Sequence, residues 1–424
     1  MPLENNFLHS KYSRSDPGER VKYVTFQTGA PPHSPPWSEA LGHLGTTLHQ
    51  AGVRMVILVY GCYLGTDIFG SGRLDEVGGL KRGYSRGIPG LESLLALLRP
   101  GDFQKPPAES ALHPPYANDT HTRDQLDAIV GDTGNFTAEY SQALQDGLSK
   151  HGQLPLTCTR ILWSSVNHHL GRLEAALSLF HELQTLRSAN TLSPDDRILI
   201  LGHGHAGQVL ALVSNVIAPG ETTIRPYLFE ILESSVQGNL WSTEVGAHLQ
   251  ELTTFLSQAK PDLPSLDLVT LGTPIRYGWD IGGIGKLLHL VNHRPIRGDA
   301  KRWLAKMDLP QVVMEMQAAI GGDYIQQMAV AGTDAVPATP ELEELNQSLR
   351  ENLEPFDGFE RWLECTRRVT RCPNDGQCIL IDYQDAANVA PGEHLYGHAC
   401  YTRMGSLLFQ TTQIVEALYP QPST

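Results

Sequence analysis

The segment from Arg197 to Val216 holds the residues whose types and spacing point most directly to chemistry. It begins with the apolar run Arg-Ile-Leu-Ile-Leu, turns at Gly-His-Gly-His-Ala, and continues with the composition of a helix. A strand and a helix joined by so short a turn pack closely, and the residue at its apex takes a positive φ that glycine adopts freely. In a covalent catalyst of this layout the apex carries the nucleophile. Here the apex is Gly204, which has no side-chain oxygen.

This turn resembles the nucleophile elbow, G-x-S-x-G, of bacterial lipases and esterases with the α/β-hydrolase fold. Their elbow often reads G-H-S-x-G or G-H-S-x-A, and the residues from Gly202 to Ala206 match it except at serine. The resemblance implies an α/β fold, a mostly parallel sheet flanked by helices, with an inserted cap or lid. It also implies a Ser-His-Asp triad with Gly204 in place of the serine. Flavodoxin-like and dinucleotide-binding folds have similar strand–glycine–helix junctions. The interpretation as a nucleophile elbow therefore depends on finding the other members of the triad in the right order.

A second motif lies upstream, where the buried run Val56–Val59 leads into Tyr-Gly-Cys-Tyr-Leu-Gly. It resembles the oxyanion loop H-G-x-x-x-G of the same family, with Tyr60 in the place of the histidine. By this resemblance the backbone N–H of Cys62 or Tyr63 pairs with that of His205 to form an oxyanion hole. Tyr60 and Leu64 are then expected to contact the substrate.

The acid of the triad is expected at Asp334. It follows a predicted strand, Ile325–Val330, in the sequence Gly-Thr-Asp-Ala-Val-Pro, which resembles the lipase segment that carries the catalytic aspartate. Asp382 and Asp385 are alternatives at the end of the next strand. A turn aspartate that only caps the following segment is the structural alternative.

The histidine of the triad is expected at His398, in Gly-His-Ala between the last strand and the last helix. His394 in the same loop is an alternative. The chain order of nucleophile position, acid and histidine, with Gly204, Asp334 and His398, is that of α/β-hydrolases rather than of chymotrypsin or subtilisin.

Polar residues also follow the strand predicted to end at Trp163. Ligands bind α/β sheets at the carboxyl ends of the strands, so Asn167 and His168 are candidates for substrate contact.

Adjacent histidines, such as those at positions 168 and 169, rarely converge on one metal ion, and the spacing of Cys365, Cys372 and Cys378 fits no zinc pattern. No metal site and no organic cofactor are therefore expected.

Apolar runs of strand length alternate with helical stretches along the chain, a pattern typical of a mostly parallel sheet wound with helices. Several runs are apolar throughout, as expected for strands covered on both faces. Strands are predicted at Val21–Gln27, Arg54–Tyr60, Thr159–Trp163, Arg197–Leu201, Leu266–Thr270, Ile325–Val330 and Gln377–Asp382, and helices at Trp37–Ala51, Leu170–Thr185, Gly207–Val216, Val245–Ala259 and Ser406–Leu418.

The spacing of these elements divides the chain. Residues 1–70 and 156–424 are expected to form the hydrolase core, and residues 71–155 separate two strands by more than a crossover requires. This long segment is predicted to be a cap or lid over the site. Smaller insertions are expected near residues 295–323 and 340–374.

Composition restricts the partners. The 424 residues carry 46 acidic and 32 basic side chains, a formal net charge of −14, and no basic cluster suited to nucleic acid. No run of about 18 apolar residues is present, so no integral membrane segment is expected. The polar N-terminus lacks the apolar core of a secretory signal, which favours a cytoplasmic location unless a leader has been removed.

The expected function is that of a carboxylic-ester hydrolase scaffold acting on a small, lipid-like or polyester substrate. Because Gly204 closes the covalent route, the chain as given is expected to be inactive or nearly so. The otherwise complete motif set favours an inactivating substitution. The alternatives are a natural pseudo-hydrolase that binds a ligand or acts as a scaffold, and an amidase or thioesterase of the same fold.

Overall fold

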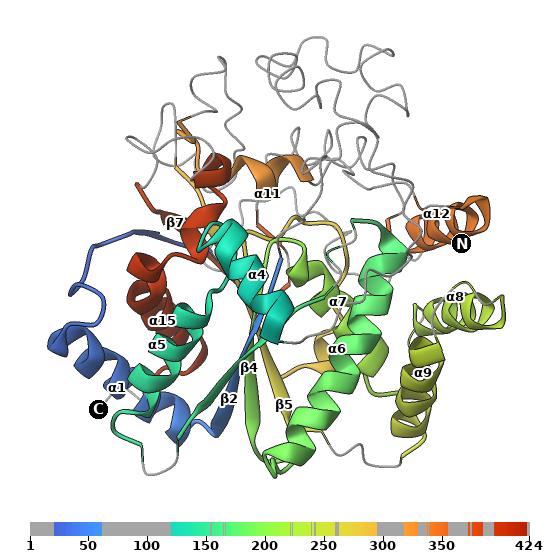
Figure 1. Ribbon diagram of the computed structural model, residues 1–424, viewed down its shortest axis with the longest axis horizontal. Helices are drawn as coiled ribbons and strands as arrows, with labels where there is room; N and C mark the ends of the chain where they lie inside the picture. The colour runs from blue at the N-terminus through green and yellow to red at the C-terminus, as the bar shows by residue number, and fades with distance from the viewer. Residues whose placement is uncertain are drawn as a thin grey trace.

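Seven parallel strands, packed between helices on both faces, form the centre of the computed structural model and place it in the α/β class (Figure 1). The structure describes residues 21–61, 120–152, 155–163, 165, 167–220, 222, 224–238, 240, 243–258, 263–294, 318–329, 337, 339–354, 372–373, 375–384 and 394–421.

The strand order in the sheet is β1-β7-β6-β5-β4-β2-β3, and every neighbouring pair is parallel. The carboxyl ends of all seven strands therefore lie at one edge. The strands are β1 (Val21–Thr25), β2 (Val53–Val59), β3 (Thr157–Ile161), β4 (Arg197–His203), β5 (Ser265–Leu271), β6 (Lys286–Asn292) and β7 (Gln377–Asp382).

Two hydrophobic cores lie on opposite faces of the sheet, because successive side chains of a strand point to opposite faces. In β4, Ile198 and Ile200 pack into one core, while Leu199 and Leu201 pack into the other. This double burial explains why the central strands are apolar throughout rather than alternating.

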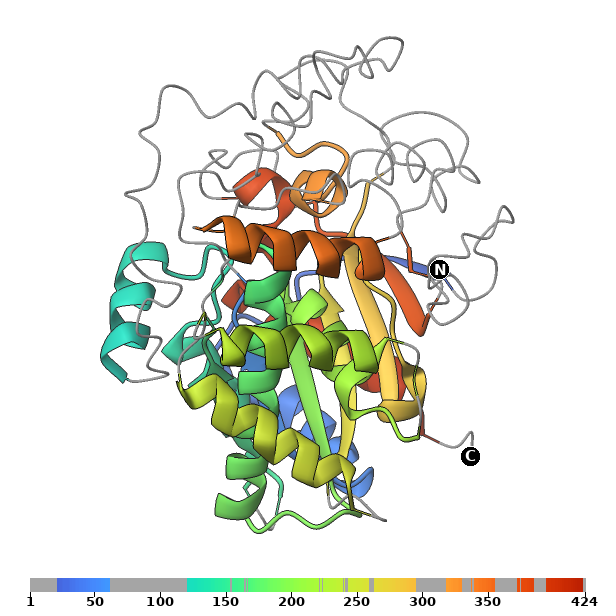
Figure 2. The same cartoon turned by 90° about the vertical axis from the view of Figure 1, so that its right-hand side faces the viewer.

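Helices cover each face. On one face lie α1 (Pro35–Gln50), α5 (Ala138–Ser149) and α15 (Met404–Leu418). On the other lie α6 (His169–Ala189), α7 (Ala206–Ile217), α8 (Arg225–Gln237), α9 (Thr243–Leu256) and α12 (Pro340–Leu353). Figure 2 shows α12, in orange, crossing the layer that contains α6 and α8. Shorter elements are α4 (Thr120–Val130), α11 (Tyr324–Met328), and the 3-10 turns Ile281–Gly283, Leu395–Gly397 and Ala399–Tyr401.

Six of the seven predicted strands are confirmed, with ends shifted by a few residues. The predicted strand Ile325–Val330 is wrong: residues 324–328 form α11. Asp323 caps this helix, its side chain accepting a hydrogen bond from the N–H of Gln326, and glutamine and methionine favour a helix. The remaining strand of the sheet is β6, which the sequence analysis did not predict.

Part of the segment predicted as a cap belongs to the helical layer that covers the sheet. α5 packs against α1 and β3, and Tyr140, Leu144 and Leu148 join the core beneath α1. Residues 71–119 lie outside the described residues, so a cap formed by them stays a prediction. In the insertion predicted near residues 340–374, α12 packs against α6 and α8. No helix in the described part of the chain combines the length and apolar character needed to cross a membrane.

The contact between α1 and α5 depends on a glycine. A Cβ atom built on Gly45 would lie 1.8 Å from the carbonyl oxygen of Leu148, so no larger residue fits without a backbone shift. We predict that Gly45→Ala lowers the free energy of unfolding by about 1–3 kcal/mol, the usual cost of overpacking. Urea denaturation measures this change.

Gly405→Ala is the matched control, because a Cβ there meets nothing within 4 Å. Its free energy of unfolding is expected to stay the same or rise by up to about 1 kcal/mol, since alanine favours the α15 helix. Equal stabilities of the Gly45→Ala variant and the parent would contradict the close packing of α1 on α5.

Candidate active site

Three chain segments meet where β4, β6 and β7 end. Gly204 follows β4 directly, Asp323 lies beside the last residue of β6, and His398 comes from the loop that follows β7. Open parallel sheets bind ligands outside the carboxyl ends of their strands, so this is the edge at which a site is expected.

The turn after β4 is held by its neighbours. Gly204 has a φ of +53°, and its N–H donates to the carbonyl oxygen of Leu271, at the end of β5, over 2.8 Å. The hydroxyl of Thr273 donates to the carbonyl oxygen of Gly204, also over 2.8 Å. Gly61 approaches the same turn so closely that a Cβ on it would lie 1.6 Å from the carbonyl oxygen of His203. The turn is thus fixed in the left-handed conformation that glycine tolerates best.

His398 and Asp323 form a hydrogen-bonded pair. The distance between Nδ1 of His398 and Oδ2 of Asp323 is 2.7 Å, and the carboxylate is fully buried. An ionised carboxylate only accepts hydrogen bonds, so this contact favours the tautomer of His398 that carries its hydrogen on Nδ1. The other ring nitrogen, Nε2, faces Gly204.

The carboxylate of Asp323 is itself held from three sides. Oδ1 accepts the N–H of Gln326 over 2.8 Å, and Oδ2 also accepts the hydroxyl of Tyr401 over 3.0 Å. That hydroxyl in turn accepts the N–H of Asn292, at the end of β6, over 2.6 Å. Burial, and then the charge of Asp323, hold the pKa of Tyr401 well above its ordinary value, so it stays a neutral donor.

A second imidazole lies against the first. The ring centroids of His203 and His398 are 4.3 Å apart, and Nε2 of His203 lies 3.0 Å from the carbonyl oxygen of His398. Burial, and then the proximity of His398, hold the pKa of His203 well below its ordinary value. His203 is therefore a neutral packing and hydrogen-bonding partner that fixes the loop of His398.

Gly204 and His398 are in direct contact. A Cβ atom built on Gly204 would lie 2.8 Å from Nε2 of His398 and 3.4 Å from its Cε1. Side-chain Cβ atoms do not come this close to a ring nitrogen. The imidazole therefore occupies part of the space that the side chain of a nucleophile would need.

The predicted site residues divide into two groups. Gly204 lies against His398, and His205 follows Gly204 at the start of α7, with its Nδ1 3.2 Å from the side-chain oxygen of Gln208. Cys62, Tyr63, Leu64 and Asp334 lie outside the described residues, so the oxyanion loop stays a prediction. Within the described residues, the carboxylate that contacts His398 is Asp323.

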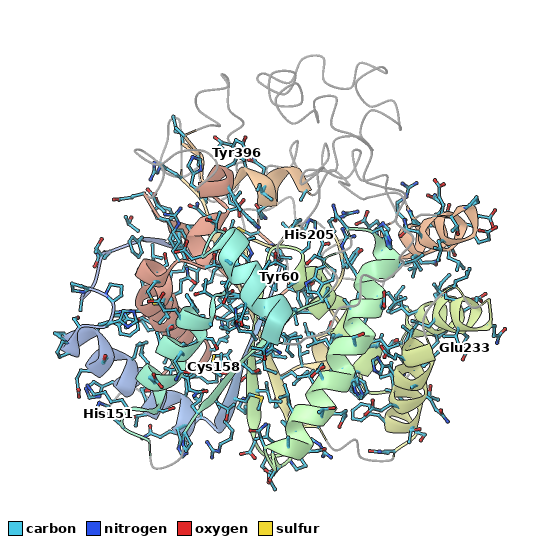
Figure 3. All side chains as sticks on the ribbon, viewed as in Figure 1. Tyr60, His151, Cys158, His205, Glu233 and Tyr396 are labelled. Atoms are coloured by element: carbon cyan, nitrogen blue, oxygen red, sulfur yellow. The ribbon has the colours of Figure 1, made fainter. Side chains whose placement is uncertain are left out.

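Tyr60 is buried at the end of β2, next to Gly61, where it packs against Leu126 and Leu162. Its carbonyl oxygen accepts the indole N–H of Trp163. Figure 3 shows Tyr60 and His205 near the middle of the view. A role for Tyr60 in substrate contact stays a prediction.

Asn167 and His168 are tied into the start of α6. Nδ1 of His168 accepts the N–H of Gly171 over 2.9 Å, and the side-chain oxygen of Asn167 accepts from the buried Arg172. Arg172 also donates to the hydroxyl of Tyr277 over 2.9 Å. These contacts give both residues a structural role, and their contact with substrate stays a prediction.

The alternative acid and histidine have other partners. Asp382 pairs with Arg294 over 2.9 Å, and Nδ1 of His394 accepts the N–H of Gly397 over 3.2 Å. Asp385 lies outside the described residues. Among the described candidates, His398 is the histidine that contacts both the elbow and an acid.

Asp323 is not among the residues predicted for the site, although a signal for it is present. Asp323-Tyr-Ile-Gln326 has the spacing of a helix N-terminus, an acceptor followed three residues later by glutamine. A helix here, instead of a strand, places the acid at its cap. Nothing in the spacing of His203 indicates that it packs on His398.

Comparisons with protein-family models, with curated proteins and with solved structures found no match to this chain.

The buried histidines predict how stability depends on pH. His289, on β6, lies 2.6 Å from the hydroxyl of Thr270 and 3.1 Å from the carbonyl oxygen of Asp375, and burial lowers its pKa to about 4. The folded chain keeps it neutral, whereas the unfolded chain binds a proton below pH of about 6.5. Above that pH, His289 does not change the stability. As the pH falls from 7 to 5, it lowers the free energy of unfolding by about 2 kcal/mol. His203 adds a loss of the same sign.

Unfolding by urea at a series of pH values measures this dependence. His289→Gln removes the titrating ring but keeps a donor and an acceptor, so the fall in stability between pH 7 and pH 5 is expected to be smaller in this variant. Parallel curves for the variant and the parent would show that His289 is not buried in its neutral form.

Proposed function

We propose that the chain has an α/β-hydrolase fold and carries a site of the ester-hydrolase type without its nucleophile. In this proposal Gly204 stands at the nucleophile position, His398 is the general base, and Asp323, rather than Asp334, is the acid that orients it. The chain as given then binds a carboxylic ester and hydrolyses it very slowly or not at all.

One observation carries the proposal: Asp323 holds Nδ1 of His398 at 2.7 Å while Nε2 faces the apex of the turn between β4 and α7. The three positions follow one another along the chain as apex, acid and histidine, which is the order in α/β-hydrolases. The strand, turn and helix around Gly204 have the layout of the nucleophile elbow.

Each group has a defined role in the proposed chemistry. The carboxylate of Asp323 keeps the imidazole in the tautomer whose Nε2 accepts a proton. A serine at position 204 would pass its proton to Nε2, attack the ester carbonyl and form an acyl-enzyme that water hydrolyses. The N-terminus of α7, with the backbone N–H of His205, is suited to stabilise the oxyanion. This chemistry uses no metal ion and no organic cofactor.

The substrate class proposed is a carboxylic ester, lipid-like or polymeric. An amide or thioester would use the same groups, so substrate panels must separate these classes.

A ligand-binding protein is the second candidate, and the contact between Gly204 and His398 favours it. Because a Cβ at position 204 would lie 2.8 Å from Nε2, a serine requires the imidazole to move, although Asp323 and His203 hold it. This is the arrangement expected if the site has been adjusted to glycine.

Gly204→Ser tests the proposal. We expect turnover of p-nitrophenyl esters to rise by at least about 10³-fold over the chain as given, with a burst of acyl-enzyme, because the nucleophile is restored. The variant is also expected to lose about 1–2 kcal/mol of stability, since serine at this φ is strained. Stopped-flow kinetics and urea denaturation measure the two effects.

The two candidate acids are compared in the Gly204→Ser background. Asp323→Asn is expected to lower kcat by about 10⁴-fold, because the imidazole loses the partner that sets its tautomer. Asp334→Asn is expected to change kcat much less. The reverse result would restore Asp334 as the acid, and a folded Gly204→Ser variant inactive on esters, amides and thioesters would favour the ligand-binding protein.

A further inference from the structure

A trio of metal-ligand side chains lies apart from the candidate active site. Within the described part of the chain, Glu39, His43 and His151 are the group whose ligand atoms converge, all within 4.8 Å of one another. We propose that they form a binding site for a divalent transition-metal ion of the zinc type, which links α1 to the chain just after α5.

The sequence places two of the ligands on one helix face. Glu39 and His43 are four residues apart on α1, and side chains at this spacing are neighbours on a helix surface. His151 comes from the other side, two residues beyond the end of α5. The three ligands thus belong to two segments that are far apart in the sequence.

The distances suit a metal ion. Oε1 of Glu39 lies 2.8 Å from Nε2 of His151 and 3.8 Å from Nε2 of His43. In a tetrahedral zinc site with bonds of about 2.0–2.1 Å, ligand atoms are about 3.3 Å apart. Only small rotations are needed, and the side chain of His43, which is 74% exposed, has room to make them.

The position of His151 is set by packing. A Cβ atom on Gly42 would lie 2.4 Å from Cδ2 of His151, so the imidazole rests on the bare backbone of α1. The close contact of α1 with α5 at Gly45 holds the two segments together. His151 is therefore held in place before an ion binds, which reduces the ordering cost of binding.

Lys150 occupies the other oxygen of the carboxylate. Its ammonium lies 2.7 Å from Oε2 of Glu39, and the hydrogen bond it donates lowers the pKa of this carboxyl group. Oε1 stays directed toward the two imidazoles. Glu39 is thus an ionised ligand, and the nearby positive charge weakens cation binding without blocking it.

The ligand types select the ion. Two imidazoles and one carboxylate suit zinc, copper, nickel and cobalt, whereas magnesium and calcium prefer oxygen ligands alone. Three protein ligands leave a fourth position for water. Figure 3 shows His151 at the lower left of the view, far from Tyr60 and His205, so an ion here acts on the packing of α1 rather than on the candidate active site.

Calorimetric titration of the full chain with zinc chloride tests the proposal. We expect one saturable site, and a rise in Tm with zinc that magnesium chloride does not produce. His43→Ala and His151→Ala are each expected to weaken zinc binding by at least about tenfold and to abolish the rise in Tm, because even indirect partners of a metal contribute that much.

His33→Ala is the matched control: His33 is also an exposed histidine near α1, and it pairs with Glu139 rather than with the trio. It should bind zinc as the parent does. All three substitutions are at the surface, and circular dichroism checks that the variants fold. The proposal is overturned if the parent shows no saturable binding, if the double variant His43→Ala, His151→Ala binds zinc as the parent does, or if His33→Ala loses as much affinity as His43→Ala.

Discussion

The hydrogen bond between Asp323 and His398 is the interaction on which the candidate site depends. It joins the chain segments that follow β6 and β7, at the sheet edge where β4 turns into α7. A parallel sheet brings strand ends to one edge but does not set side-chain directions. Those are set by local contacts. The start of α11 and the hydroxyl of Tyr401 hold the carboxylate, and the carbonyl oxygen of His398 lies against the ring of His203. Each partner is buried, so losing one leaves a polar group without compensation.

Gly204 shows how backbone and side-chain requirements compete in this turn. The strand and helix force a φ of +53°, a conformation that is free for glycine and strained for serine. In an active hydrolase, the surrounding structure maintains the strained conformation of the nucleophile. Here the strain is absent, and the imidazole has come within 2.8 Å of where a Cβ would be. This contact is compatible with both functions proposed for the site, a hydrolase that lacks its nucleophile and a binding site built around glycine.

Much of the fold could be predicted because it is encoded in short apolar runs. β2 and β4 are mostly apolar, and the turn at Gly204 is predicted from the apolar run before it, its small residues and the helical stretch after it. β6 was missed because His289 and Asn292 interrupt its apolar pattern; both are buried, and their polar groups find partners in Thr270, Asp375 and Gly397. These hydrogen-bond partners are distant in the sequence, so no local pattern predicts that the polar side chains of β6 can be buried. His398 was predictable from its place after the last strand, whereas Asp323 lies just before the predicted strand Ile325–Val330 and caps the helix that forms there instead.

The position of Asp323 cannot be found from the end of a strand. A residue that directly follows a strand can be predicted from that strand. Asp323 instead lies far along the chain from β6, and its backbone N–H donates to the carbonyl oxygen of Asn292 at the end of this strand. The long excursion between them carries no pattern that fixes its length. Its position is fixed by the antiparallel bridge between His293 and Gly322, which returns the chain to the sheet one residue before Asp323. A glycine at position 322, with a φ of +96°, allows that return, because a Cβ there would lie 2.4 Å from the carbonyl oxygen of Asn292. The site therefore depends on a backbone contact that leaves almost no trace in the sequence except a glycine.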